Sequence, residues 1–195
     1  MLNDRSSILS LLETRRSGKP RELVGPGPTA AEMERILTIA ARVPDHGKLS
    51  PWRFVLVGDD QRADLARLLR AALADEQPNA PAAVAEKAEQ FAHYAGQLVV
   101  LLAAPVQGHK IPVWEQELSV GNAGMNLLTA AHALGYVAGW VTGWQAVSPG
   151  VNAAFCNEGE RIAGFIFIGH PARDLEDRPR PKLEDVARQW QPPAI

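Results

Sequence analysis

The sequence is poor in several features by which protein classes are commonly recognised. Its 195 residues include one cysteine, Cys156, which excludes an intramolecular disulfide and a cysteine-rich metal cage. The formal net charge is only -2, so no overall field attracts nucleic acid or anionic lipid. The longest apolar run, 98–106, is far too short to cross a membrane. We therefore expect neither a nucleic-acid partner nor a membrane partner.

The N-terminal segment does not read as a sorting signal. Residues 1–17 lack the continuous apolar stretch of a signal peptide, and their acidic residues disfavour a transit peptide. Together with the single cysteine, this predicts a cytoplasmic protein. Apolar residues make up 46% and charged residues 22%, as in an ordinary globular chain, and we expect one domain over 1–195.

The common motifs of metal, nucleotide and nucleophile sites are absent as well. The five histidines have no metal-ligand spacing, and neither a GxGxxG nor a GxxxxGK[ST] segment occurs. No GxSxG marks a nucleophilic serine, and Cys156 has no obvious base near it in sequence. We therefore expect no metal site and no catalysis by a serine or cysteine nucleophile.

Helices and short strands follow one another in the predicted element order. Apolar periodicity and capping residues predict helices over 4–14, 29–42, 61–75, 84–95, 113–134 and 149–155. Apolar runs predict strands over 52–57, 98–104, 136–141 and 164–168. This order fits an α/β or an α+β fold. Because helices precede the first strand and one long helix separates the second and third strands, we favour α+β, with helices flanking a small sheet.

Local signals place several of these elements more closely. Thr29 followed by Glu32 forms a capping box at the start of the second helix. Asn3 or Asp4 is expected to cap the first helix. The strand over 98–104 is uninterrupted and apolar, which predicts a central place in the sheet.

The last part of the chain differs in composition from the rest. From residue 171 onward it contains five prolines among many charged residues. Such a segment cannot form a core of its own, so we expect 171–195 to be an extended arm lying on another part of the assembly. Arg178, Arg180 and Lys182 in this arm are either phosphate contacts or solvated surface charges.

The helix over 113–134 is apolar on two faces, and its third stripe is mostly small and neutral: Glu115, Ser119, Asn122, Asn126 and Thr129. Such a helix should be buried nearly all round. Gly121 and Gly124 each cost roughly 1 kcal/mol in helix propensity, which close approach of another backbone would explain. Either the helix packs within one subunit, or it forms much of a dimer interface with its polar stripe satisfied across the seam. We favour the second.

Three segments are candidates for ligand contacts. Arg15, Arg16 and Ser17 offer two guanidiniums and a hydroxyl, which suit a phosphate but equally a solvated basic helix end. The loop over 42–52 is dense in hydrogen-bond donors, as a ligand rim or a solvated surface turn would be. In 139–144, two glycines let backbone amides approach a flat ring, although the same residues fit a strand end with two core tryptophans.

Taken in order, these segments resemble the nitroreductase family, most closely its branch of small NAD(P)H nitroreductases. The matching segments span nearly the whole chain: RRS at 15–17, RVPDH at 42–46, PWRF at 51–54, WEQE at 114–117, GWVTG at 139–143 and GFIFIG at 164–169. Two departures are visible. Asp45 and Lys48 stand where larger members often carry Ser and Asn, and the tail around Arg178 and Arg180 is similar to the phosphate-contacting tail of longer members.

The resemblance implies a nitroreductase-like α+β fold with a small, mainly antiparallel sheet, in an intertwined homodimer with one FMN in each of two interface sites. The residues that it assigns to FMN are Arg15, Arg16, Ser17, Trp140, Val141, Thr142 and Gly143 of one chain, Arg42 and His46 of the partner chain, and Arg180 or Arg178 of the tail. An amide of Thr142 or Gly143 would lie near flavin N5. Nicotinamide contacts are usually assigned to 130–135, which we expect to be buried.

The resemblance also implies an activity. NADH or NADPH would deliver a hydride to FMN and leave, and a nitroaromatic, quinone or similar acceptor would then take its place, in a ping-pong reaction. No side-chain acid or base is required. The alternatives are a flavin-binding or storage module without turnover, and a related flavoenzyme such as a dehalogenase, for which 76–95 would have to supply the lid.

Overall fold

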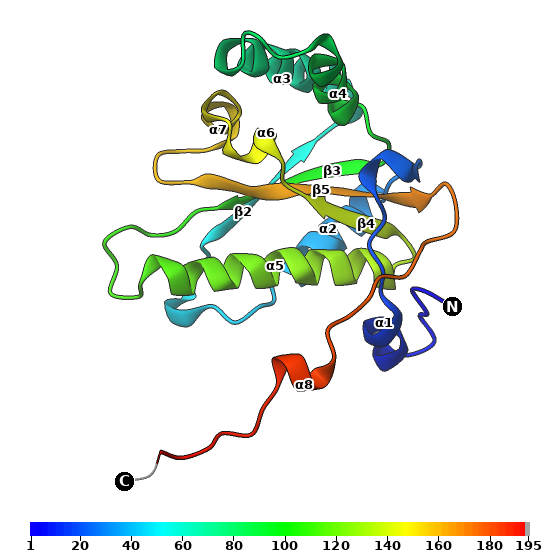
Figure 1. Ribbon diagram of the computed structural model, residues 1–195, viewed down its shortest axis with the longest axis vertical. Helices are drawn as coiled ribbons and strands as arrows, with labels where there is room; N and C mark the ends of the chain where they lie inside the picture. The colour runs from blue at the N-terminus through cyan, green and yellow to red at the C-terminus, as the bar shows by residue number, and fades with distance from the viewer. Residues whose placement is uncertain (194–195) are drawn as a thin grey trace.

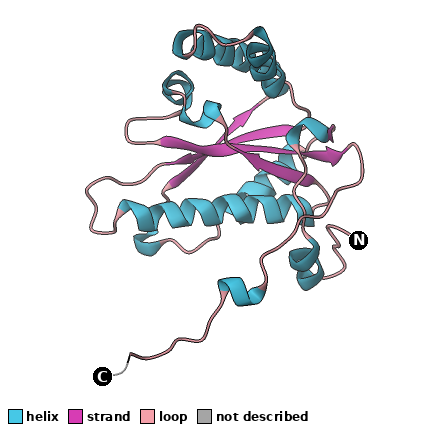
Figure 2. Ribbon diagram, viewed as in Figure 1, coloured by secondary structure: helices cyan, strands magenta, loops and turns pink. Residues whose placement is uncertain are grey.

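A computed structural model describes residues 1–193 of the chain, and it consists of one sheet with helices on both faces (Figures 1 and 2). The strands are β1 Leu23–Val24, β2 Trp52–Val57, β3 Gln97–Ala103, β4 Val137–Val141 and β5 Arg161–Pro171. The helices are α1 Ile8–Thr14, α2 Ala30–Ala40, α3 Arg62–Glu76, α4 Ala82–Ala92, α5 Val113–Ala133, α6 Trp144–Val147, α7 Pro149–Phe155 and α8 Leu183–Val186. Short 3₁₀ turns occupy Pro20–Glu22, His46–Lys48 and Asp59–Gln61.

All pairs in the sheet are antiparallel. The order is β1-β5-β3-β2, and β4 also pairs with β5. Because β3 has a partner on each side, it is a central strand, as its sequence predicts, and Leu98 to Ala103 are fully buried. The α+β fold with a small antiparallel sheet is thereby confirmed.

Alternate residues of β3 serve two separate cores, as the period of two in a strand requires. Leu98, Val100 and Leu102 face α3, α4, α6 and α7, above the sheet in Figure 1. Val99 and Leu101 face α2 and α5 on the other side. A strand that is buried on both faces reads as a continuous apolar run, and this explains why β3 is the clearest strand in the sequence.

Several predicted boundaries need correction. The capping box at Thr29 is present, since Glu32 N–H donates to its hydroxyl and its own N–H donates to the Glu32 carboxylate. However, that helix ends at Ala40, and not at 42. The first helix begins at Ile8 and is capped by Ser7, because Asn3 and Asp4 are used in bonds that tie the N-terminus to Thr14 and Arg16. The helix predicted over 84–95 lies at 82–92, and β5 is longer than predicted at both ends.

The prediction that α5 is buried nearly all round is wrong for a single chain. One apolar face is open: Trp114 is 64% exposed, Leu118 60% and Met125 40%. The two glycines of the helix also differ. A Cβ on Gly124 would meet the indole of Trp140 at 2.3 Å, whereas a Cβ on Gly121 would meet nothing within 4 Å. Gly124 therefore makes room for a side chain of the same chain, and Gly121 lies on the open face.

Ser119 and Asn126 of the polar stripe of α5 are bonded within the chain, which corrects the expectation of bonds across a seam for these two residues. Ser119 Oγ donates to the Pro44 carbonyl over 2.9 Å. Asn126 Nδ2 donates to the carbonyls of Ile39 and Arg42, at 3.1 and 3.0 Å. This stripe therefore fixes the segment between α2 and β2 on one side of α5.

Residues 172–178 lie against the segment that follows α1, since Ala172 N–H donates to the Glu22 carbonyl and Asp177 Oδ1 lies 3.6 Å from Arg16 Nε. Farther on, the chain with α8 runs away from the body of the protein (Figure 1), and Leu183, Val186 and Trp190 are 77%, 65% and 72% exposed. That the arm lies on another part of the assembly stays a prediction, and 194–195 lie outside the described residues. Within 1–193, no helix combines the length and hydropathy of a membrane span, and no cluster of three or more metal-ligating side chains occurs.

Candidate functional site

A cavity of about 590 Å³ lies between three parts of the chain. They are the segment that follows α1, the end of β4 with the residues after it, and the C-terminal end of α4. It brings together sequence-predicted residues that lie more than 120 positions apart: Arg16, Ser17, Trp140, Val141, Thr142 and Gly143. Arg178, the alternative tail contact, also lines the cavity, and residues that the sequence did not indicate complete the wall: Gly18, Lys19, Pro20, Arg21, Phe91, Tyr94 and Gln145.

The two segments are held against each other by backbone contacts. Gly18 N–H donates to the Ala138 carbonyl over 3.3 Å. A Cβ on Gly139 would lie 2.4 Å from the Gly18 carbonyl oxygen, so only glycine allows this approach. The pairing places the residues after α1 directly beside the end of β4.

Arg16 is unusual among the basic residues of this site. It is only 6% exposed, and its Nε has no hydrogen-bond partner among residues 1–193. The nearest carboxylate oxygen, on Asp177, is 3.6 Å from Nε. A buried donor without a partner costs free energy, and it marks a place where an acceptor from outside the chain would bind.

Other guanidiniums surround Arg16. Burial lowers the pKa of Arg16, and the charges of Arg178 and Arg180 lower it further, against the opposite effect of Asp177. Burial, followed by the charge of Arg180, lowers the pKa of Arg15 as well. Four arginines thus share one nearby carboxylate, and their mutual repulsion would be relieved by an anion.

The side chain of Arg15 is turned toward the second predicted phosphate contact. Its Nη1 donates to Ser17 Oγ over 3.2 Å. Arg15 itself is not among the residues that line the cavity, although it is next to Arg16 in the chain. The arrangement therefore fits a phosphate held chiefly by Arg16 and Ser17, with Arg15 behind them.

At the end of β4 the backbone, more than the side chains, faces a ligand. The indole Nε1 of Trp140 donates to the Ala163 carbonyl over 3.2 Å, and its ring packs against the positions of Gly124 and Gly164. That ring is therefore part of the fold. Thr142 and Gly143 are exposed, and Gly143 has a positive φ of 76°, a conformation that other residues adopt at a cost.

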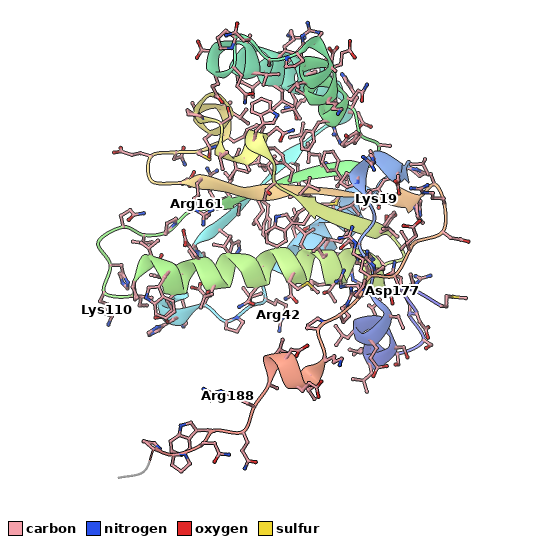
Figure 3. The ribbon with its side chains drawn as sticks, in the orientation of Figure 1. Lys19, Arg42, Lys110, Arg161, Asp177 and Arg188 are labelled. Carbon is pink, nitrogen blue, oxygen red and sulfur yellow. The ribbon has the colours of Figure 1, made fainter. Side chains whose placement is uncertain are left out.

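Arg42 and His46 do not line this cavity, and Figure 3 shows Arg42 and Lys19 on opposite sides of α5. Both are exposed. His46 Nδ1 lies 2.6 Å from Glu115 Oε1, so the α5 stripe also holds this imidazole. Within one chain, these two residues are placed away from the other predicted contacts.

Arg180, the tail residue predicted to help bind FMN, is close enough to Arg15 and Arg16 to affect the pKa of both, although it does not line the cavity. Arg178 does line it. The sequence left these two as alternatives, and the structure places Arg178 at the wall with Arg180 beside the cluster.

The segment 130–135 is buried only in its first half, since residues 130–132 are buried, Ala133 is exposed and residues 134–135 are half-buried. His132 is fully buried, and neither ring nitrogen has a hydrogen-bond partner among residues 1–193. Burial, and next the charge of Arg15, lowers the pKa of His132 to about 4, so the ring is neutral near pH 7. A neutral imidazole beside Arg15 adds no further positive charge to the arginine cluster.

Residues 12–170 match the sequence model of the nitroreductase family. The chain belongs to the nitroreductase family. A protein of Haemophilus influenzae named "Putative NAD(P)H nitroreductase" is 37% identical over 164 residues, which cover 83% of this chain and 86% of that protein. Protein YdjA of Escherichia coli strain K12, whose name carries the same description, is 34% identical over 168 residues, or 84% and 87% of the two chains.

Solved structures show the same fold at lower identity. The nitroreductase-like family protein from Bacillus cereus has a TM-score of 0.81 at 18% identity, covering 94% of this chain and 95% of that one. A variant of the FMN and NADPH-dependent nitroreductase NfnB from sphigopyxis sp. strain HMH has a TM-score of 0.72 at 17% identity, covering 92% and 96%. The nitroreductase-like fold predicted from the resemblance is therefore confirmed.

Proposed function

We propose that this nitroreductase-family chain is an FMN-dependent NAD(P)H oxidoreductase. The observation that carries the proposal is Arg16, a buried guanidinium with an unpartnered Nε inside a cluster of four arginines. A phosphate monoester supplies the charge and the acceptor oxygens that this cluster lacks. The relatives named as NAD(P)H nitroreductases and the FMN-dependent structural neighbour support the choice of flavin and reductant.

Each group of residues has its own part in binding. Arg16 and Ser17, with Arg15 behind them, hold the phosphate and the chain that leads to the ring. Val141, Thr142 and Gly143 would line the place of the flavin ring, and a backbone amide in this segment would supply a hydrogen-bond donor that stabilises negative charge on it. Phe91 and Tyr94 also line the cavity, and we assign the space beside them to the substrates.

When bound, FMN supplies the hydride chemistry by accepting two electrons from NADH or NADPH and passing them to a second substrate. The protein orients both substrates and excludes competing geometries, and the reaction needs no side-chain acid or base. The two substrates react in turn with the same flavin, in a ping-pong order, with a nitroaromatic or a quinone as acceptor.

We further propose that the working unit is a homodimer whose seam runs along α5. The open stripe of Trp114, Leu118 and Met125 is an exposed apolar surface, of the kind that marks an interface. A second chain on this stripe would bring its Arg42 and His46 toward the cavity that one chain leaves without them. The domain over 1–195 would then extend its C-terminal arm along the assembly.

The absorption spectrum of the purified protein tests the flavin and the turnover together. We expect yellow protein whose flavin absorbance near 450 nm bleaches when NADH or NADPH is added without oxygen and returns on addition of a nitroaromatic or quinone. Flavin that stays oxidised with both reductants would show a storage module. Protein that purifies colourless and does not bind added FMN would overturn the proposal.

The oligomeric state is tested separately. Leu118→Glu places a charge in the centre of the proposed seam, and Val147→Glu places one on an equally exposed apolar residue of α6 as a control. In sedimentation, we expect a dimer for the natural chain and for the control, and a monomer for Leu118→Glu. A monomeric natural chain at micromolar concentration would exclude this seam.

A further inference from the structure

A second cavity, of about 680 Å³, lies next to the one described above. The two share Arg21, Phe91, Tyr94 and Gln145 as walls. The second cavity extends along α4 and is closed by Trp144 at the start of α6. It is thus a continuation of the proposed flavin cavity, on the side of α4, above the sheet and away from α5 in Figure 1.

The aromatic wall of this cavity is fixed in place from behind. Phe91 packs edge-on against Phe165 and Phe167, with ring centroids 5.2 Å apart in each pair. Tyr94 packs against Phe91 at 5.7 Å. Since Phe165 and Phe167 are fully buried in β5, the wall cannot easily move. Rigid aromatic faces suit a planar ring.

The cavity has two permanently charged side chains, Arg21 and Lys87, and both are basic. His93 also lines it, and no carboxylate does, among the described residues. The one acidic residue of α4 close to a cation, Glu89, is bound to Arg70 of α3 at 2.6 Å and so is turned to another partner. Lys87 makes no ion pair within residues 1–193, and Arg21 has only Glu22, at 3.8 Å. The field in the cavity is therefore positive.

We propose that this cavity binds the oxidising substrate, and that the substrate is a planar aromatic compound with an anionic substituent such as a carboxylate or a sulfonate. The ring lies along Phe91, Tyr94 and Trp144, and the anion is held by Lys87 with Arg21 and His93 around it. For a nitroaromatic, the nitro group takes one hydride and one proton and becomes a nitroso group and water, with NAD(P)H as the reductant. This inference rests on the function proposed above.

A second ligand combines an anion with a flat ring. This is the dinucleotide, which carries phosphates and also stacks a ring on the flavin. The two sources are separable because the two half-reactions are measured alone. We commit to the acceptor, since the basic groups lie beside an aromatic wall large enough for one ring and offer no recognisable adenosine pocket.

The test uses the holoenzyme, reduced without oxygen and mixed in a stopped-flow instrument with 4-nitrobenzoate or with the nearly isosteric, neutral 4-nitrobenzamide. We expect the natural chain to react about tenfold faster with the anion at subsaturating concentration, and salt to reduce this preference. Lys87→Gln should lower the preference about threefold and Lys87→Glu should abolish it, with the benzamide rate unchanged. Arg67→Gln, on an exposed arginine of α3 outside the cavity, is the matched control and should change nothing.

The outcomes are distinct from failure of the proposed function. Equal rates with both acceptors in the natural chain and in all variants, from a flavin that does turn over, would overturn this inference alone. If the Lys87 variants slow reduction by NADPH but leave both acceptors unaffected, the anion is a dinucleotide phosphate and the acceptor assignment is wrong. Flavin that is never reduced would instead contradict the oxidoreductase itself.

Discussion

Arg16 and Arg53 are the same residue type in two opposite situations. Arg53 Nε donates to Glu160 Oε1 over 2.7 Å, and its Nη2 donates to the other carboxylate oxygen and to the Phe155 carbonyl. Arg16 is more deeply buried, yet its Nε has no partner among residues 1–193. Arg53 is thus satisfied by the fold, whereas the nearest carboxylate to Arg16 Nε, on Asp177, lies 3.6 Å away, too far for a hydrogen bond.

The surroundings of the two arginines shift their pKa values in opposite directions. Hydrogen bonding to Glu160 raises the pKa of Arg53, while burial and two neighbouring arginines lower the pKa of Arg16. The first pair stabilises the protein, whereas burial and repulsion disfavour the charge of Arg16 in one chain. The comparison therefore supports the proposed anion-binding role of Arg16, which the sequence alone does not distinguish from a structural one.

The largest effect is expected at Arg16. Arg16→Met removes the guanidinium but keeps an apolar stem, and we expect the dissociation constant for FMN to rise about 100-fold, or roughly 2.7 kcal/mol. The apoprotein should be as stable as before or more stable, because a desolvated and repelled charge has been removed. Flavin fluorescence titration and denaturant unfolding of the apoprotein measure the two quantities. A change in affinity below threefold would contradict the assignment of Arg16.

A pH-dependent effect is expected at His132, a buried group that, unlike arginine, can lose its charge. Its pKa is about 4 in the folded protein and about 6.5 when unfolded, so below pH 6.5 the unfolded state binds more protons. Stability should therefore fall as the pH is lowered from about 6.5 to 4, by about 3 kcal/mol in total. His132→Leu should remove this part of the slope in urea unfolding curves. If the stability of both proteins fell equally as the pH was lowered, the argument from the burial of His132 would be refuted.

Glu160→Gln should weaken the satisfied pair. Because Glu160 is only 10% exposed and holds Arg53 with both oxygens, we expect a loss of about 2 kcal/mol, or about 4–8 °C in melting temperature, without an effect on FMN affinity. Hydrogen bonding to Arg53 lowers the pKa of Glu160, so this stabilisation is complete above the unfolded pKa and disappears as the pH falls through the folded one. An altered FMN affinity would show that the two regions are coupled.

The smallest effect is expected at Glu115. Its partner His46 is 66% exposed, and exposed ion pairs contribute little, so Glu115→Gln should change the free energy of unfolding by less than about 0.5 kcal/mol. Ser119→Ala, on the same stripe but at a buried hydroxyl that donates to the Pro44 carbonyl, should cost about 1 kcal/mol. Thermal unfolding of the two variants gives the order. If Glu115→Gln were the more destabilising of the two variants, the His46–Glu115 pair would be far less exposed to solvent in the assembled protein than it is in one chain.

Local features of the fold follow well from the sequence. The capping box at Thr29 is correct because its bonds lie within four residues, and β3 is correct because burial on both faces leaves a continuous apolar run. The predicted start of the first helix is wrong because Asn3 and Asp4 form hydrogen bonds with residues thirteen and ten positions farther along the chain. The two-residue strand β1 and the four-residue helices α6 and α8 are too short for a periodic signal.

The candidate site also shows that the sequence predicts local features better than contacts between distant parts of the chain. Residue types and family resemblance pointed to 15–17 and 139–143, and the structure brings both segments to one cavity. The sequence did not indicate Phe91 and Tyr94, because their place depends on how α4 packs over the sheet. The open face of α5 has a related reason: apolar periodicity identifies an apolar face, but it does not say whether the same chain or a partner covers it. The dimer interface on this face stays a prediction.

The arginine cluster joins residues 15–16 to residues 178–180, and this has a consequence for synthesis. A ribosome adds about 5 to 20 residues per second, so roughly 8 to 32 s separate Arg16 from Arg178. During that time the nascent chain carries an arginine whose companions have not been made. Loading of the cofactor would therefore follow translation of the tail, and chains that terminate early would keep much of the core yet leave the ribosome without a complete phosphate clamp.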